Sequence, residues 1–167
     1  MCIRDRNESV IKAPTQGYTR ALTFTNGKLY AIGSSKGRIV EGVDWEKQTF
    51  KVYDSFDPAG RQSAAGSWKT TGLVLNDAEF FKGRWYATSY FTRAYAKGTD
   101  FNENKFIRFK TLDDMVRGNW TDISSLVPSG LTPYFLTVNE NKLYLATFNH
   151  ESKGSGDCIL QFEPNKN

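Results

Sequence analysis

Short stretches in which apolar and polar residues alternate recur along the chain and predict β-strands, because successive side chains on a strand point to opposite faces. Three stretches share one plan: an alternating strand, a two-residue turn, and a second strand that begins with a bulky residue and a tyrosine. They cover residues 24–32, 80–88 and 138–146. Their tyrosines, Tyr30, Tyr86 and Tyr144, are 56 and 58 positions apart. The pattern therefore predicts three copies of a unit of about 57 residues.

The turns and the remaining runs of β-forming residues complete each copy. The turns, which need residues that tolerate positive φ, are Asn26-Gly27, Lys82-Gly83 and Glu140-Asn141. A third strand is predicted in every copy, over residues 38–43, 106–109 and 159–162. A fourth strand is predicted in the first two copies only, over residues 49–53 and 120–123. Four antiparallel strands per unit are typical of a β-propeller blade, so the third copy lacks its last strand.

The repeat predicts an all-β fold, a β-propeller of about three four-stranded antiparallel blades. A β-sandwich also uses short strands, but it does not predict the same turn and tyrosine at a fixed period. Propellers usually have about four to eight blades, so we expect an incomplete ring. We expect one propeller segment over residues 7–163, with a tail at 164–167 and blades over residues 17–56, 72–126 and 131–163.

The first residues of the chain do not fit the repeat. Residues 1–6 have no periodicity, no helix cap and no apolar segment of a signal peptide. They resemble the translated adapter that starts reading frames assembled from environmental DNA, so we exclude them and expect a truncated N-terminus. Either upstream sequence supplies the missing blades, or chains associate to close the ring. The adapter-like start favours upstream sequence.

Charge and composition argue against several classes of function. The chain has 22 basic and 18 acidic residues without a basic block, which argues against nucleic-acid binding. No apolar run approaches the ~20 residues of a membrane-spanning helix. Outside the first six residues the only cysteine is Cys158, which we expect to be buried. The chain has a single histidine and no metal-ligand spacing, so we predict no metal and no cofactor.

The first strand of each propeller blade lines the central channel, where ligands bind. The copies align three sets of residues there: Arg20, Asn76 and Tyr134; Ala21, Asp77 and Phe135; Thr23, Glu79 and Thr137. Asp77 and Glu79 share one face of a strand, with about 6.5–7 Å between their Cα atoms. Paired carboxylates serve as general acid and base in glycoside hydrolysis, so both are candidate catalytic residues. The alternative is that they pair with basic groups or water and take no part in chemistry.

The aromatic residues fall into two groups. Tyr30, Tyr86, Tyr144 and Trp85 occupy the repeated position and are predicted to pack between blades. Tyrosines at less regular positions lie near strand starts or loops, where their rings can stack on sugars. We expect two long loops, over residues 57–71 and 92–104, to border the same end of the channel. The candidate ligand-binding residues are Arg20, Asn76, Tyr90, Tyr95, Tyr134 and His150.

A second pattern supports a carbohydrate ligand. An acidic residue precedes a Gly-x-Trp-Tyr strand within residues 76–90, and residues 111–115 and 120–122 follow it with an acidic turn and a tryptophan. This stretch resembles blades of five-bladed glycoside hydrolases of the arabinanase and invertase type. The resemblance implies catalytic acids on three different blades. The aligned Ala21 and Phe135 lack a carboxyl group, so only Asp77 matches the family's pattern.

Three functions are compatible with these observations. The first is a propeller segment that binds a ligand or partner, either a carbohydrate or another protein, because the catalytic set is incomplete. The second is a fragment of a glycoside hydrolase. The third is a structural interaction protein of a phage or cell surface. We expect missing blades or a second chain to close the ring, and an extracellular or cell-surface location.

Overall fold

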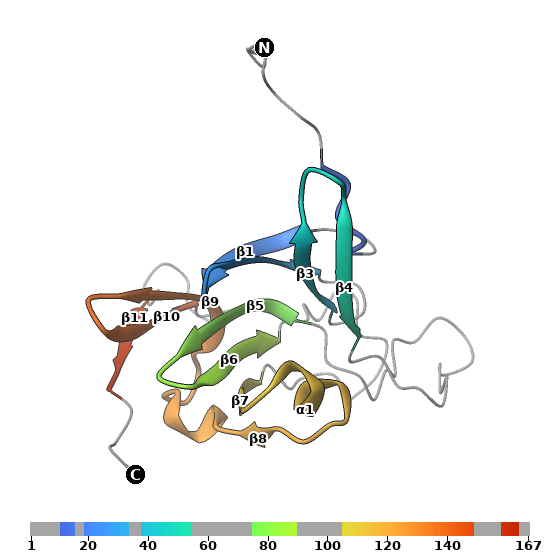
Figure 1. The fold of residues 1–167 in the computed structure, drawn as a ribbon. Coiled ribbons are helices and arrows are strands. Elements are labelled where there is room, and N and C mark those ends of the chain that lie inside the picture. Colours follow the sequence, from blue (N-terminus) through green and yellow to red (C-terminus); the bar gives the residue numbers. More distant parts are fainter. Residues whose placement is uncertain are drawn as a thin grey trace.

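The computed structural model describes residues 11–15, 19–33, 38–54, 75–89, 105–148 and 158–163 of the chain. Its strands form three antiparallel sheets, each built from consecutive strands (Figure 1). Sheet 1 contains β1 (Thr19–Thr25), β2 (Lys28–Gly33), β3 (Arg38–Asp44) and β4 (Thr49–Asp54). Sheet 2 contains β5 (Leu75–Phe81), β6 (Arg84–Ser89), β7 (Phe106–Phe109) and β8 (Thr121–Asp122). Sheet 3 contains β9 (Thr132–Asn139), β10 (Lys142–Phe148) and β11 (Cys158–Phe162).

The sheets confirm the all-β prediction, and every predicted strand is present. The largest difference is β8, which has two residues where four were predicted, because Ile123 already leads into a short 3-10 helix, η2 (Ser124–Leu126). Among the described residues, sheet 3 holds three strands. Each sheet also lies within one of the three residue ranges predicted for the blades.

Each sheet opens with a hairpin closed by two residues of positive φ. The φ angles are 51° and 73° at Asn26-Gly27, 47° and 80° at Lys82-Gly83, and 47° and 63° at Glu140-Asn141. Two residues of positive φ give the turn a twist that matches the right-handed twist of the strands. The predicted turns are therefore confirmed, and the third forms without glycine.

The first strand of each sheet carries a β-bulge near its start. The pairing of this strand with its neighbour shifts by one residue at an equivalent place in all three sheets. The residues left unpaired at these bulges are Arg20, Asn76 and Tyr134. These are the residues that the sequence alignment placed in one register. A bulge bends its strand and re-aims the neighbouring side chains.

Sheet 2 is buried on both faces, because sheet 1 packs on one face and sheet 3 on the other. Tyr30 of sheet 1 meets Trp85 of sheet 2 edge to face, with 5.1 Å between ring centroids, inside the first core. Tyr86 points to the opposite side of sheet 2 and packs in a second core with Leu143 and Leu145 of sheet 3. Successive residues of β6 thus contact different neighbouring sheets, as the alternation of a strand requires.

We call the face of each sheet that carries the repeated tyrosine its leading face, and the opposite face its trailing face. The leading face of sheet 1 packs on the trailing face of sheet 2, and the leading face of sheet 2 on the trailing face of sheet 3. Tyr30 and Tyr86 are buried as predicted. The prediction is wrong for Tyr144, which is only partly buried, since no described sheet covers the leading face of sheet 3.

The prediction that Cys158 is buried is also wrong. Cys158 is a free, exposed cysteine at the start of β11, which is an edge strand of sheet 3. Its backbone carbonyl accepts a hydrogen bond from Thr147 Oγ1 at 3.1 Å. Small apolar residue types are often buried, but at the beginning of an edge strand little of the chain is available to cover the side chain.

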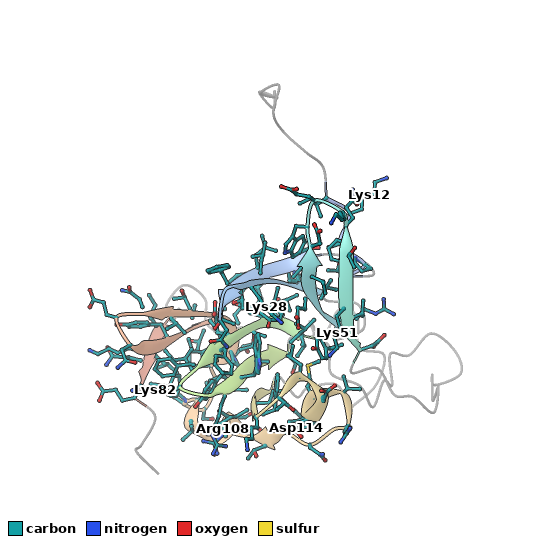
Figure 2. The ribbon with its side chains drawn as sticks, in the orientation of Figure 1. Lys12, Lys28, Lys51, Lys82, Arg108 and Asp114 are labelled. Atoms are coloured by element: carbon teal, nitrogen blue, oxygen red, sulfur yellow. The ribbon has the colours of Figure 1, made fainter. Side chains whose placement is uncertain are left out.

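One short helix, α1 (Leu112–Val116), interrupts the strands of sheet 2. It begins with a capping box: Thr111 Oγ1 accepts from Asp114 N at 3.1 Å, and Asp114 Oδ2 accepts from Thr111 N at 3.0 Å. Leu112 and Met115 point into the core between sheets 1 and 2. Figure 2 shows Asp114 at this helix. The cap fixes the start of the helix, and the two apolar residues hold it on the sheets.

Candidate functional site

The first strands of the three sheets bring the candidate residues together. β5 contacts both β1 and β9, so the strand that carries Asp77 and Glu79 lies between the two others (Figure 1). The bulges of the three strands are at equivalent positions near their starts. Polar side chains next to a bulge on β5 can therefore reach the backbone of the neighbouring first strand.

Asn76 and Asp77 bind the backbone of β9. Asn76 Nδ2 donates to the carbonyl oxygen of Tyr134 at 2.8 Å, and Thr88 Oγ1 donates to the same oxygen at 2.5 Å. Asp77 Oδ2 accepts from Leu136 N at 2.7 Å, and Asp77 Oδ1 accepts from Ala78 N at 2.8 Å. Both oxygens of the candidate catalytic carboxylate are thus engaged by backbone amides. We call these contacts the β5–β9 clamp.

The clamp supplies partners for backbone groups of β5 and β9, which are edge strands of their sheets: the Tyr134 carbonyl at its bulge and the amides of Leu136 and Ala78. Buried backbone groups without a hydrogen bond cost free energy, which explains why polar side chains are found here inside the protein. Asp77 is buried, and desolvation raises the pKa of its carboxyl group to about 6, although the hydrogen bonds from Leu136 and Ala78 act in the opposite direction. Burial therefore has a larger effect on this group than its two hydrogen bonds.

Glu79 differs from Asp77 in its surroundings. It is partly buried on the leading face of sheet 2, and desolvation raises the pKa of its carboxyl group to about 7. The Thr23 hydroxyl lowers this pKa and the Asp77 carboxylate raises it further. Thr23 Oγ1 is buried, and no described group lies in hydrogen-bonding geometry with it, so the hydroxyl is near the carboxyl group without forming a well-aligned bond. Glu79 is the carboxyl group of this site that is not held by backbone amides.

Arg20 and Tyr134 share the bulge position of Asn76 but have different surroundings. Arg20 is exposed on β1. Tyr134 is partly buried, and its ring contacts that of Phe135 at 4.2 Å between centroids. It enters the clamp through its backbone carbonyl, not its ring. The equivalent position thus has one backbone geometry and three different side chains.

The remaining predicted ligand contacts lie outside the described residues. This applies to Tyr90, Tyr95 and His150, and to the predicted loops over residues 57–71 and 92–104. The structure places the other predicted site residues on three neighbouring first strands: Arg20 on β1, Asn76, Asp77 and Glu79 on β5, and Tyr134 on β9. Asn76 bonds directly to the Tyr134 carbonyl, and Asp77 lies close enough to Glu79 to raise its pKa.

A polar cluster that was not predicted from the sequence lies on the leading face of sheet 1. Glu41 is buried, and its carboxylate accepts from Lys28 Nζ at 2.5 Å and from the Tyr53 hydroxyl at 3.1 Å. Lys51 Nζ lies over the Tyr53 ring, 4.6 Å from its centroid. Figure 2 labels Lys28 and Lys51 on this sheet. The residues around Glu41 predict a strand but not this cluster. Nothing in the local sequence indicates that a lysine and a tyrosine of the two neighbouring strands contact the Glu41 carboxylate.

Other kinds of site have no support in the part of the chain that the structure describes. Within these residues no three His, Cys, Asp or Glu side chains gather as a metal site would require. No helix in the described ranges is long and apolar enough to cross a membrane. Comparison with family models, with curated proteins and with solved structures gives no match for this chain.

Proposed function

We propose that this chain is a β-propeller segment that binds a protein partner through the outer faces of its first and last sheets. In this arrangement the three sheets are successive blades, and β1, β5 and β9 are their innermost strands. The order of strands in each sheet and the packing of leading face on trailing face support it. A propeller blade contacts its neighbours in the same way, through both faces of a twisted sheet.

The β5–β9 clamp favours binding over catalysis. A general acid or nucleophile must present a free oxygen to its substrate. Both Asp77 oxygens accept backbone hydrogen bonds, and one of them joins two sheets. The aligned residues Ala21 and Phe135 have no carboxyl group. These contacts support a role for Asp77 in positioning two first strands.

The observation that carries the proposal is the large apolar side chains on the two outer faces. Leu22 and Phe24 are exposed on the trailing face of sheet 1, and Phe135 and Ile159 on the leading face of sheet 3. Contiguous exposed apolar side chains mark interaction sites in soluble proteins. On the sheet 1 face the exposed apolar side chains lie on the outer strands, Leu22 and Phe24 on β1 and Val52 on β4, whereas the middle strands are buried at Ala31 and Val40.

The test measures the fluorescence of bis-ANS, a dye that binds exposed apolar surface, with variants in which only the sheet 1 face stays apolar. Ile159→Lys places a charge on the leading face of sheet 3, so that this face no longer binds an apolar partner. We expect the folded variant to bind the dye at Leu22 and Phe24. Adding Leu22→Lys should remove most of this fluorescence, since a charged side chain then replaces one of the two large apolar side chains exposed on β1. Adding Leu126→Lys is the matched control, because Leu126 is also exposed but lies on η2, away from both faces. Equal dye binding by the two double variants would contradict the proposal.

A second candidate function, glycoside hydrolysis, is favoured by Glu79. Its carboxyl group has a pKa of about 7, which suits a general acid at neutral pH. The test is release of reducing sugar from arabinan and from sucrose by the chain and by its Glu79→Gln variant. Activity that falls by on the order of 100-fold in the variant would favour this function, in line with the usual contribution of a general acid. Absence of sugar release by the unmodified chain would reject it.

A further inference from the structure

We infer that the partner is a second copy of this chain, with the leading face of sheet 3 of one copy packed on the trailing face of sheet 1 of the other. This inference rests on the proposed function. It names the occupant of the two outer faces and the way in which they pair. The evidence is that each face has the residues, at the same positions, that are buried where sheets pack inside one chain.

The leading face of sheet 3 is built like two faces that are covered. Ile159 pairs with Ala146 on β10, as Ile39 pairs with Ile32 in sheet 1 and Phe106 with Thr88 in sheet 2. Ile39 and Phe106 are both 0% exposed, whereas Ile159 is 76% exposed. Tyr144 on the same face is equivalent to the buried Tyr30 and Tyr86. The face therefore has the apolar residues of a sheet interface, and none of the described sheets lies against it.

The trailing face of sheet 1 exposes apolar side chains whose equivalents in sheets 2 and 3 are covered by the preceding sheet. Leu22 is aligned with Ala78 of sheet 2 and Leu136 of sheet 3, which are 0% and 6% exposed because the preceding sheet covers them. Leu22 itself is 61% exposed. Phe24 is 72% exposed; of its equivalents, Phe80 packs against the first core, and Val138, at 37%, lies at the margin of a covered face. This face is therefore the kind of surface on which a leading face packs.

The two faces fit each other better than either fits itself. Inside the chain, the tyrosine of each sheet shares a core with one particular residue of the next sheet, the bulky residue that precedes the tyrosine there. These pairs are Tyr30 with Trp85 and Tyr86 with Leu143. The third pair of this series is Tyr144 of one copy with Leu29 of the other. We call each such contact heterologous because it joins two different faces, although a two-fold axis that repeats it makes the complete interface symmetric. Two copies of residues 1–167 related by a two-fold axis make this contact twice and bring their six described sheets into one ring, within the usual range for propellers.

The first experiment is sedimentation equilibrium of the full chain over a concentration series. We expect a species of twice the chain mass, and we expect Leu22→Lys and Ile159→Lys each to weaken the association by roughly 30-fold or more, because each places a charge in an apolar interface. Leu126→Lys, the same substitution at an equally exposed leucine of η2, should leave the association unchanged. Circular dichroism verifies that all variants are folded.

The second experiment mixes the two interface variants. Leu22→Lys keeps an intact sheet 3 face and Ile159→Lys keeps an intact sheet 1 face, so the mixture should form a one-to-one dimer through a single interface. Neither variant alone can make that contact. A contact between identical faces would give a different result: one variant would stay dimeric alone, and mixing would restore nothing. That result would overturn the heterologous pairing.

Failure of this inference can be distinguished from failure of the proposed function. If the unmodified chain stays monomeric but Ile159→Lys binds bis-ANS at Leu22, the outer face is a docking surface and the second copy is not its occupant. If the chain is monomeric and the dye does not depend on Leu22, both proposals are wrong. The unmodified chain could also form assemblies of more than two copies that Leu22→Lys and Ile159→Lys each abolish. That result would support the contact between the two different faces but would overturn the closed ring of two copies.

Discussion

At the scale of single residues, Glu79 links burial to a dependence of stability on pH. Burial raises the pKa of its carboxyl group from 4.5 to about 7, so the folded state holds the proton more tightly than the unfolded state. The resulting stabilisation is fully present below about pH 4.5 and is lost as the pH rises through about 7. Asp77 acts in the same direction over a lower range, since the pKa of its carboxyl group is raised to about 6.

Glu79→Gln should remove the contribution of this residue. We expect the variant and the unmodified chain to have similar unfolding free energies at about pH 4, where Glu79 is neutral, and the variant to be the more stable of the two at about pH 8. Urea unfolding at both pH values measures this difference. A Glu79→Gln effect that does not vary with pH would contradict the assigned burial.

At the scale of elements, the clearest case is α1, a helix of five residues. Such a helix is too short to be stable alone, so its cap and its two core side chains must hold it in place. Thr111→Ala removes the hydroxyl that accepts from Asp114 N and should lower the unfolding free energy by about 1 kcal/mol. Thr111→Ser keeps the accepting oxygen and should retain most of that stability. Thermal unfolding of both variants tests this, and equal losses would show that the cap contributes nothing.

At the scale of the whole molecule, the middle sheet joins two cores. Trp85 is central to the first core: its ring lies 5.1 Å from Tyr30 of sheet 1, 5.5 Å from Phe80 and 6.4 Å from Phe109. Trp85→Ala should lower the unfolding free energy by about 3–5 kcal/mol, because it opens a cavity between two sheets. Urea denaturation followed by circular dichroism measures the loss.

The control for this prediction is Trp45→Ala. Trp45 lies in the turn between β3 and β4 and is partly buried, and its ring contacts that of Phe50 on β4 at 5.2 Å between centroids. Its removal leaves the contact between sheets 1 and 2 in place, so we expect the smaller loss. A loss as large as that of Trp85→Ala would mean that packing between sheets contributes no more than packing within one sheet.

Much of the secondary structure could be predicted because its causes are local. Asn26-Gly27 and Lys82-Gly83 tolerate the positive φ that a two-residue turn needs, and the alternation on either side fixes the strands. The aligned register of Arg20, Asn76 and Tyr134 proved to be the position of a bulge. The α1 helix was missed, although Thr111 and Asp114 have the spacing of a capping box, because a run of five residues has too little periodicity to indicate a helix.

The sequence by itself thus determined the strands, the turns, the three sheets and which residues share a face, since these depend on neighbours a few positions apart. Only the tertiary structure decided what covers each face. The tyrosine that follows each of the three hairpin turns is buried at Tyr30 and Tyr86 but not at Tyr144, and Asp77 accepts from the amide of Leu136, 59 positions away. The physical reason is that burial and hydrogen-bond partners are set by contacts between sheets, and equivalent residues of a repeat look alike in sequence whether or not another sheet lies against them.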